Sequence, residues 1–161
     1  MLSDSIDSPL SERELILARE TDVPPEKLYA CWTTAALYPR WFCPKPWTVS
    51  DVVLDVRPGG SSRMTMCGPD GERFPNAGVF LEVVPDRKLV FTDAYLPGWV
   101  PNPGAFFTGI ITFDPLPDGG TRYIARALHW TKANCEKHAA MGFADGWSKA
   151  FDQLVETART L

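Results

Sequence analysis

The chain has 161 residues and a net charge of −4, a length typical of one globular domain. It holds no run of lysine or arginine, and its longest apolar runs fall far short of the roughly 20 residues of a membrane helix, so neither a nucleic-acid partner nor a membrane span is expected. Aromatic residues make up 12% of the chain. Because aromatic side chains serve both as core and as pocket wall, this composition favours a large apolar interior.

Residues 1–12 are polar, without periodicity, and are expected to form a flexible leader ahead of one domain over residues 13–161. The first seven residues carry acids where a secretory signal carries lysine or arginine, which predicts a cytoplasmic protein. The cysteines lie far apart without a CxxC pair and are expected to be reduced thiols: Cys31, Cys43, Cys67 and Cys135.

The first structured elements are short. Alternation over residues 14–20 predicts a strand. Pro24 and Pro25 predict the start of a helix over residues 26–31, and a second short helix is expected over residues 34–38, ending at Pro39. Both helices are too short to be stable alone and must pack on a sheet.

The middle of the chain has the pattern of strands separated by turns rich in proline and glycine. The spacing is typical of an antiparallel meander, not of βαβ units. The expected strands cover residues 48–56, 62–66, 78–84, 88–94, 107–114 and 121–128. Between the fourth and fifth of these, residues 94–106 are rich in proline and glycine around Trp99 and predict a mobile loop of the kind that can close over a site.

The C-terminal residues 132–160 contain no proline and repeat apolar residues at three- and four-residue steps, which predicts one long helix with one apolar face. Gly142 and Gly146 interrupt it and predict either close packing against another backbone or a bend. The order of elements therefore predicts an α+β domain whose long C-terminal helix lies on an antiparallel sheet.

Several motifs, in this order and at these spacings, resemble a known family. They are TDVPPEKLYACWT at residues 21–33, Trp41-Phe42, DVRPGG at 55–60, PDG at 69–71, GVFLEVVPDRKLVFT at 78–92, GGTR at 119–122, and Gly146-Trp147. The chain is similar to the helix-grip (START-like, SRPBCC) superfamily, in the branch named after activators of the heat-shock-protein-90 ATPase. The resemblance implies a curved antiparallel sheet wrapped around a long C-terminal helix, with two short helices after the first strand. It also implies an apolar pocket between sheet and C-terminal helix.

The candidate pocket wall consists of aromatic and sulfur-bearing residues, since methionine adapts its shape to a ligand. The alternative is that most of them simply fill a close-packed core. The candidates are Trp32, Trp41, Phe42, Trp47, Met64, Met66, Phe80, Phe91, Tyr95, Phe107, Tyr123, His129, Met141 and Trp147.

Histidine is scarce. His129 is expected at the mouth of the pocket and His138 near water at the start of the last helix. Cys135 and His138 share a helix face, but a metal ion needs three or four convergent ligands, so no metal or cofactor is expected.

The sequence favours the binding of a small hydrophobic molecule without catalysis, because no GxSxG, HExxH or phosphate-binding loop is present. Two alternatives stay open. One is an interaction module with a chaperone partner, which the resemblance implies. The other is an enzyme acting on a pocket-bound substrate through His129, Asp93 or Tyr95. The fold is also compatible with a homodimer.

Overall fold

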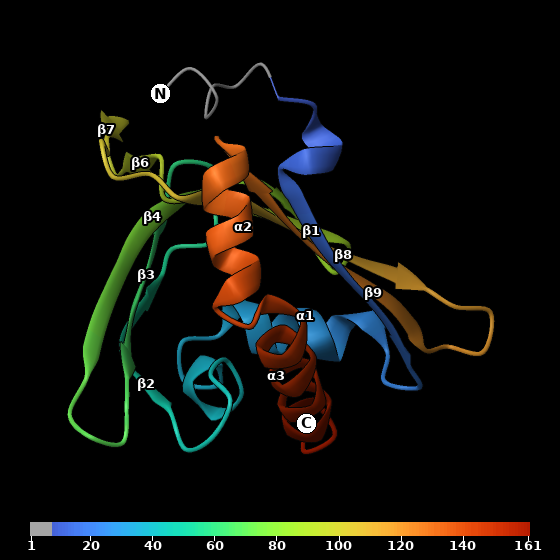
Figure 1. Cartoon of the computed structure of the whole chain (residues 1–161). Helices are drawn as coiled ribbons and strands as arrows, with labels where there is room; N and C mark the ends of the chain where they lie inside the picture. The colour runs from blue at the N-terminus through green and yellow to red at the C-terminus, as the bar shows by residue number, and fades with distance from the viewer. Residues whose placement is uncertain (1–7) are drawn as a thin grey trace.

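The computed structural model describes residues 8–161 as an α+β domain built on one curved antiparallel sheet (Figure 1). The predicted fold class is confirmed. The seven strands follow the order β1-β9-β8-β5-β4-β3-β2. The sheet strands are β1 Glu14–Thr21, β2 Thr48–Leu54, β3 Ser61–Cys67, β4 Arg73–Val84, β5 Lys88–Thr92, β8 Phe107–Pro115 and β9 Thr121–His129. The helical elements are η2 Leu10–Glu12, α1 Pro25–Thr33, η3 Tyr38–Arg40, α2 Lys132–Ala140 and α3 Phe143–Ala158.

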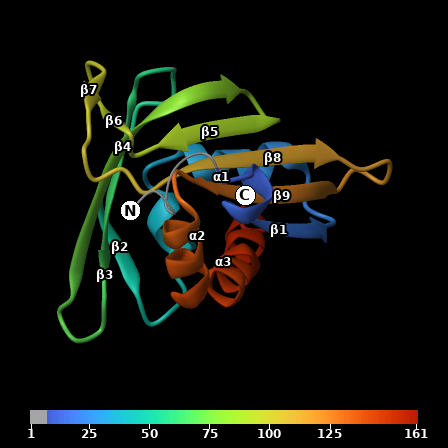
Figure 2. The ribbon, with the colours of Figure 1, turned by 45° about the horizontal axis from the view of Figure 1, so that its top comes forward.

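The sheet bends sharply between its two halves (Figure 2). Register shifts interrupt the β2–β3 pairing between Ser50 and Val53 and the β4–β5 pairing between Phe80 and Glu82. Asp51, inside the first irregularity, has a φ of 57°. Because an extra residue bends and twists the strand that carries it, these two irregularities help to curl the β2–β4 half toward the helices.

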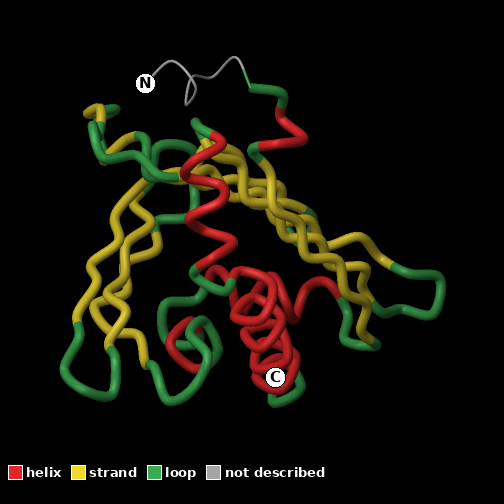
Figure 3. Tube along the Cα trace, in the orientation of Figure 1, coloured by secondary structure: helices red, strands yellow, loops and turns green. Residues whose placement is uncertain are grey.

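The helices lie inside the curve of the sheet (Figure 3). Helices α2 and α3 pack against β1, α2 also packs against β9, and α1 packs against β8. On the other half of the sheet, the main contact with a helical element is that of η3 with β2. The concave side of β3 and β4 is therefore less covered by helices than that of β1, β8 and β9.

The predicted single C-terminal helix is wrong, because the chain forms two helices. The Thr131 side chain accepts a hydrogen bond from the backbone N–H of Asn134 and caps the start of α2. Gly142 has a φ of 93°, in the left-handed region, and turns the chain into α3. The sequence allowed close packing or a bend at the two glycines; at Gly142 the chain bends.

The predicted second short helix is also displaced. Residues 35–37 form a turn, and the 3-10 helix η3 spans Tyr38–Arg40. Pro39 was expected to end the helix but lies in its first turn, where a missing backbone N–H removes no helical hydrogen bond. Of the predicted leader, residues 1–7 lie outside the described residues, and residues 10–12 form η2.

Within the segment 94–106, where a mobile loop was expected, residues 95–101 form a small ribbon. Strands β6 Tyr95–Leu96 and β7 Val100–Pro101 pair with each other, and Trp99 at the turn has a φ of 61°. The Trp99 ring contacts Tyr95, with ring centroids 5.8 Å apart, and approaches Gly59 so closely that a Cβ there would lie 3.0 Å from it.

Replacing Gly142 or Gly146 by alanine is expected to change the free energy of unfolding in opposite directions. Gly142→Ala is expected to lower the free energy of unfolding by about 1 kcal/mol, because an L side chain is strained at this φ. Gly146→Ala is expected to raise it by about 0.5–1 kcal/mol, since a Cβ there meets nothing within 4 Å and alanine is the better helix former. Urea denaturation of both variants checks this; a change of the same sign in both would contradict the break at Gly142.

Candidate ligand-binding face

Part of the predicted pocket wall is core. Trp32, Trp41, Phe80 and Tyr123 are at most 5% exposed. The Trp32 indole N–H donates to the Tyr123 hydroxyl at 3.2 Å, and the Trp41 indole N–H donates to the carbonyl of Cys31 at 3.0 Å. Because their polar atoms are paired inside the protein, these large rings are fixed packing elements.

A small void remains beside this core. Its volume is about 10 Å³, which is room for one water molecule at most. It is lined by Trp32, Tyr38, Leu54, Ser62, Phe80 and Phe91. This void is too small for a ligand, which would have to bind elsewhere on the concave side or displace side chains.

Five candidate residues form what we call the concave apolar face: Met64, Met66, Phe91, Phe107 and Trp147, all half-buried. Met66 lies directly opposite Val49, which is buried, so the β3 methionines face inward, whereas Arg63 between Ser62 and Met64 is exposed. The remaining three come from β5, β8 and α3.

Aromatic contacts connect the three aromatic members of this face. The ring centroids of Phe91 and Phe107 are 6.2 Å apart, and those of Phe107 and Trp147 are also 6.2 Å apart. The Phe91 ring lies across Gly109 on the next strand, where a Cβ would come within 2.4 Å of it. A glycine at this position therefore makes space for the ring to lie along the sheet.

Four further candidates are not part of the concave apolar face: Phe42, Trp47, Met141 and Tyr95. Phe42 stacks on Tyr38 with centroids 4.5 Å apart, and Trp47 stacks on Phe74 at 5.8 Å. Met141 is 69% exposed, so its predicted place in the pocket wall is wrong: the helical repeat that put it there ends at Gly142. Tyr95 is 38% exposed in the β6–β7 ribbon and does not join the face either.

The two histidines form a buried pair, which sequence reasoning missed. His129 is 1% and His138 8% exposed, so the expected rim position of His129 and the expected water-facing position of His138 are both wrong. His129 Nε2 lies 2.8 Å from His138 Nδ1, and His129 Nδ1 lies 2.9 Å from the Arg13 carbonyl oxygen. The pair joins β9 to α2. The periodicity of a sequence does not predict a contact between two different elements.

Aromatic rings surround this pair. His138 contacts Phe107 and Trp147 of the concave apolar face, with ring centroids 5.1 and 6.0 Å apart, and it also contacts Phe106 and Phe143. Burial lowers the pKa of His129, and burial together with the neighbouring His129 lowers the pKa of His138 to about 4. Both rings are therefore neutral at pH 7.

Asp93, the carboxylate considered for catalysis, and the strand carboxylate Glu82 both have structural partners. The Asp93 carboxylate accepts hydrogen bonds from the backbone N–H groups of Phe106 and Phe107 at 2.9 and 3.3 Å, which holds the end of the 94–106 segment. Burial raises the pKa of Asp93 against the effect of these bonds. Glu82 is exposed and forms an ion pair with Lys88 at 3.2 Å.

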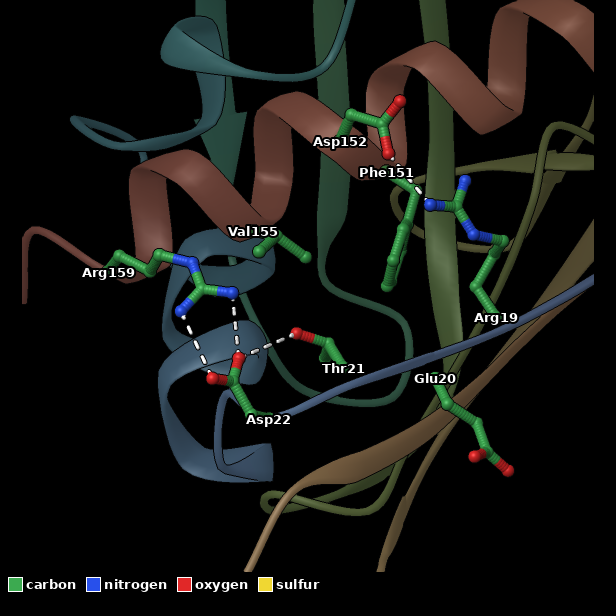
Figure 4. Close-up of a pocket in the computed structure, with 8 residues that line it drawn as sticks. All are labelled: Arg19, Glu20, Thr21, Asp22, Phe151, Asp152, Val155 and Arg159. Atoms are coloured by element: carbon green, nitrogen blue, oxygen red, sulfur yellow. Dashed lines mark hydrogen bonds and ion pairs between the residues drawn. The ribbon is translucent and has the colours of Figure 1, made fainter.

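A larger surface hollow of about 310 Å³ lies between β1 and α3, and its charges are paired (Figure 4). Arg19 binds Asp152 at 2.8 Å and lies over the Phe151 ring, 4.8 Å from its centroid. Arg159 binds Asp22 at 2.7 Å, and this pairing lowers the pKa of Asp22. Since each guanidinium already has a carboxylate partner, the hollow is best explained as ion pairs joining α3 to the sheet edge.

Within residues 8–161, no three histidine, cysteine or carboxylate side chains are grouped to hold a metal ion. No helix of that part of the chain is long and apolar enough to cross a membrane. The four cysteines are free thiols.

The fold and its apolar concave side define a helix-grip domain. Residues 22–159 match the family described as activator of Hsp90 ATPase homolog 1-like protein, and the chain belongs to this family. The predicted resemblance is confirmed. No curated protein matches the chain significantly.

Solved structures agree with this assignment. Protein NE0264 from Nitrosomonas europaea is 38% identical, with a TM-score of 0.89, and the match covers 93% of this chain and 96% of that one. A Rhodobacter sphaeroides protein is 23% identical with a TM-score of 0.80, covering 96% and 97% of the two chains. An Arthrobacter aurescens protein is 21% identical with a TM-score of 0.80, covering 96% and 91%. The last two show the fold alone.

Proposed function

We propose that this protein binds a small apolar molecule on the concave apolar face, without catalysing a reaction. Family and fold support a ligand-binding or interaction module in general. The observation that favours a small apolar ligand is the half-burial of Met64, Met66, Phe91, Phe107 and Trp147 on the inner side of the sheet. Inward-facing apolar side chains that neighbouring elements do not fully cover are available to a ligand.

The chemistry of the face fits a flat, apolar ligand. The aromatic rings offer faces and edges for stacking, and the two methionines adjust to the ligand's outline. Covering the exposed part of these side chains contributes roughly 25 cal/mol per Å² of apolar surface removed from water. Because the void beside Trp32 is only about 10 Å³, the binding energy of this proposal comes from the concave apolar face.

A charge placed on the face should abolish most of this binding. Met64→Glu is expected to weaken binding of the apolar fluorescent probe N-phenyl-1-naphthylamine at least about tenfold, because the ligand would have to desolvate a carboxylate. Fluorescence titration measures the dissociation constant, and circular dichroism confirms that the variant is folded.

Val53→Glu is the matched control. Val53 lies on the neighbouring strand, opposite the exposed Arg63, and is itself 37% exposed. The Val53→Glu substitution adds the same charge on the outer side of the sheet. It should leave the dissociation constant of the probe within about twofold of that of the unmodified protein. Absence of saturable binding to the unmodified protein, or equal weakening by both variants, would refute the proposal.

A further inference from the structure

The hydrogen bonds around the histidine pair fix where each proton lies. A carbonyl oxygen only accepts hydrogen bonds, so His129 Nδ1, at 2.9 Å from the Arg13 carbonyl, carries the proton and donates it. Because His129 is neutral, its Nε2 then holds a lone pair. That nitrogen can only accept the bond that joins it to His138.

The same logic continues one ring further. His138 Nδ1, 2.8 Å from His129 Nε2, must donate, and so it carries the proton of the neutral His138 ring. His138 Nε2 is consequently unprotonated and can only accept a hydrogen bond. The Arg13 carbonyl thus fixes, through the tautomer of His129, that His138 Nε2 is a hydrogen-bond acceptor.

His138 Nε2 is not completely enclosed by the described part of the protein. Among residues 8–161 it has no hydrogen-bond partner, yet every buried side-chain nitrogen or oxygen there has one. The atom therefore keeps some accessible surface, although the residue as a whole is only 8% exposed. The ring that carries it touches Phe107 and Trp147, two members of the concave apolar face.

We propose that His138 Nε2 is the polar recognition atom of the concave apolar face and accepts a hydrogen bond from the hydroxyl group of a phenol-type ligand. This rests on the proposed function and deepens it by naming the ligand class. An aromatic alcohol supplies both a ring for the apolar face and a donor for the lone pair. An ether, a ketone or a carboxylate offers only acceptors, which an unprotonated nitrogen cannot satisfy, so these analogues bind more weakly.

A pair of matched probes tests this. Isothermal titration calorimetry with 2-naphthol and with 2-methoxynaphthalene compares the same ring system with and without a donor. The unmodified protein is expected to bind 2-naphthol about tenfold more tightly. His138→Phe, which keeps an aromatic ring in an aromatic environment, is expected to bring the ratio of the two dissociation constants close to one while leaving 2-methoxynaphthalene binding nearly unchanged.

A measurement on the unmodified protein makes the test independent of how that variant folds. Long-range ¹H–¹⁵N NMR spectra should show the Nδ1–H tautomer of His138, and the signal of its unprotonated Nε2 should move when 2-naphthol is added. Binding of neither probe would overturn the proposed function together with this inference. Equal binding of both probes to the unmodified protein, or a preference that survives His138→Phe, would overturn this inference alone.

Discussion

Trp32→Ala is expected to lower the free energy of unfolding by about 3–5 kcal/mol, among the largest effects of any single substitution in this chain. The indole packs against the rings of Tyr38, Trp41, Phe42 and Phe91, with centroids 4.9 to 6.1 Å away. Its removal leaves a cavity that these neighbours cannot close and takes the hydrogen-bond donor from the buried Tyr123 hydroxyl. Urea denaturation measures the loss.

The same variant tests whether Trp32 is core or pocket wall. If Trp32 fills the interior, free indole should enter the cavity and restore part of the lost stability, as mass action requires. Trp99→Ala is the control: Trp99 is 53% exposed and contacts Tyr95 and Gly59, so its removal should lower the free energy of unfolding by no more than about 1–2 kcal/mol. A Trp32→Ala protein that is as stable as the Trp99→Ala protein would show that the interior is already open at Trp32.

Acidification below pH 6.5 is expected to destabilise the protein through the histidine pair. The pKa of His138 falls from its ordinary 6.5 to about 4 on folding, so between these pH values the unfolded chain binds more protons than the folded one. The free energy of unfolding then decreases as the pH falls, by about 3 kcal/mol for this shift. His129, whose pKa is also lowered, acts in the same direction, whereas Asp93, whose pKa is raised, acts in the opposite one.

Comparing the unmodified protein with His138→Phe isolates this contribution. The variant should be less stable at pH 7, because His129 Nε2 loses its hydrogen-bond donor, but its stability should depend less on pH between 7 and about 4.5. Denaturant unfolding at several pH values measures both curves. Parallel curves for the two proteins would mean that His138 titrates in the folded state as it does in the unfolded chain.

Local patterns predict most of the sheet correctly, since alternation and turn residues are short-range signals. β5, β8 and β9 begin at the expected residues, and β1 and β2 also begin where predicted. β4 begins at Arg73 instead of Gly78, because residues 73–77 pair with β3 despite Pro75. The C-terminal helix was predicted too long, since an apolar repeat passes through Gly142 without showing that the backbone turns there.

The candidate site could be predicted only in part from the sequence, because sequence patterns are short-range signals. The alternation Met64-Thr65-Met66 correctly puts both methionines on one side of β3. Met141 was assigned by extending a helical period across a break, and it lies outside. The contact between His129 and His138 depends on how α2 packs back onto β9, which is a tertiary relationship. The resemblance to a family predicted the fold, but it did not predict the contact between these two histidines.

The most direct test of the proposed function uses the protein's own methionines. Among its four methionines, Met64 and Met66 lie on the concave apolar face, while Met141 is 69% exposed outside it. In ¹³C-methyl methionine NMR spectra, addition of 2-naphthol should shift the Met64 and Met66 signals saturably and leave the Met141 signal in place. Unchanged Met64 and Met66 signals would contradict binding on this face and move the interaction-module hypothesis ahead of it.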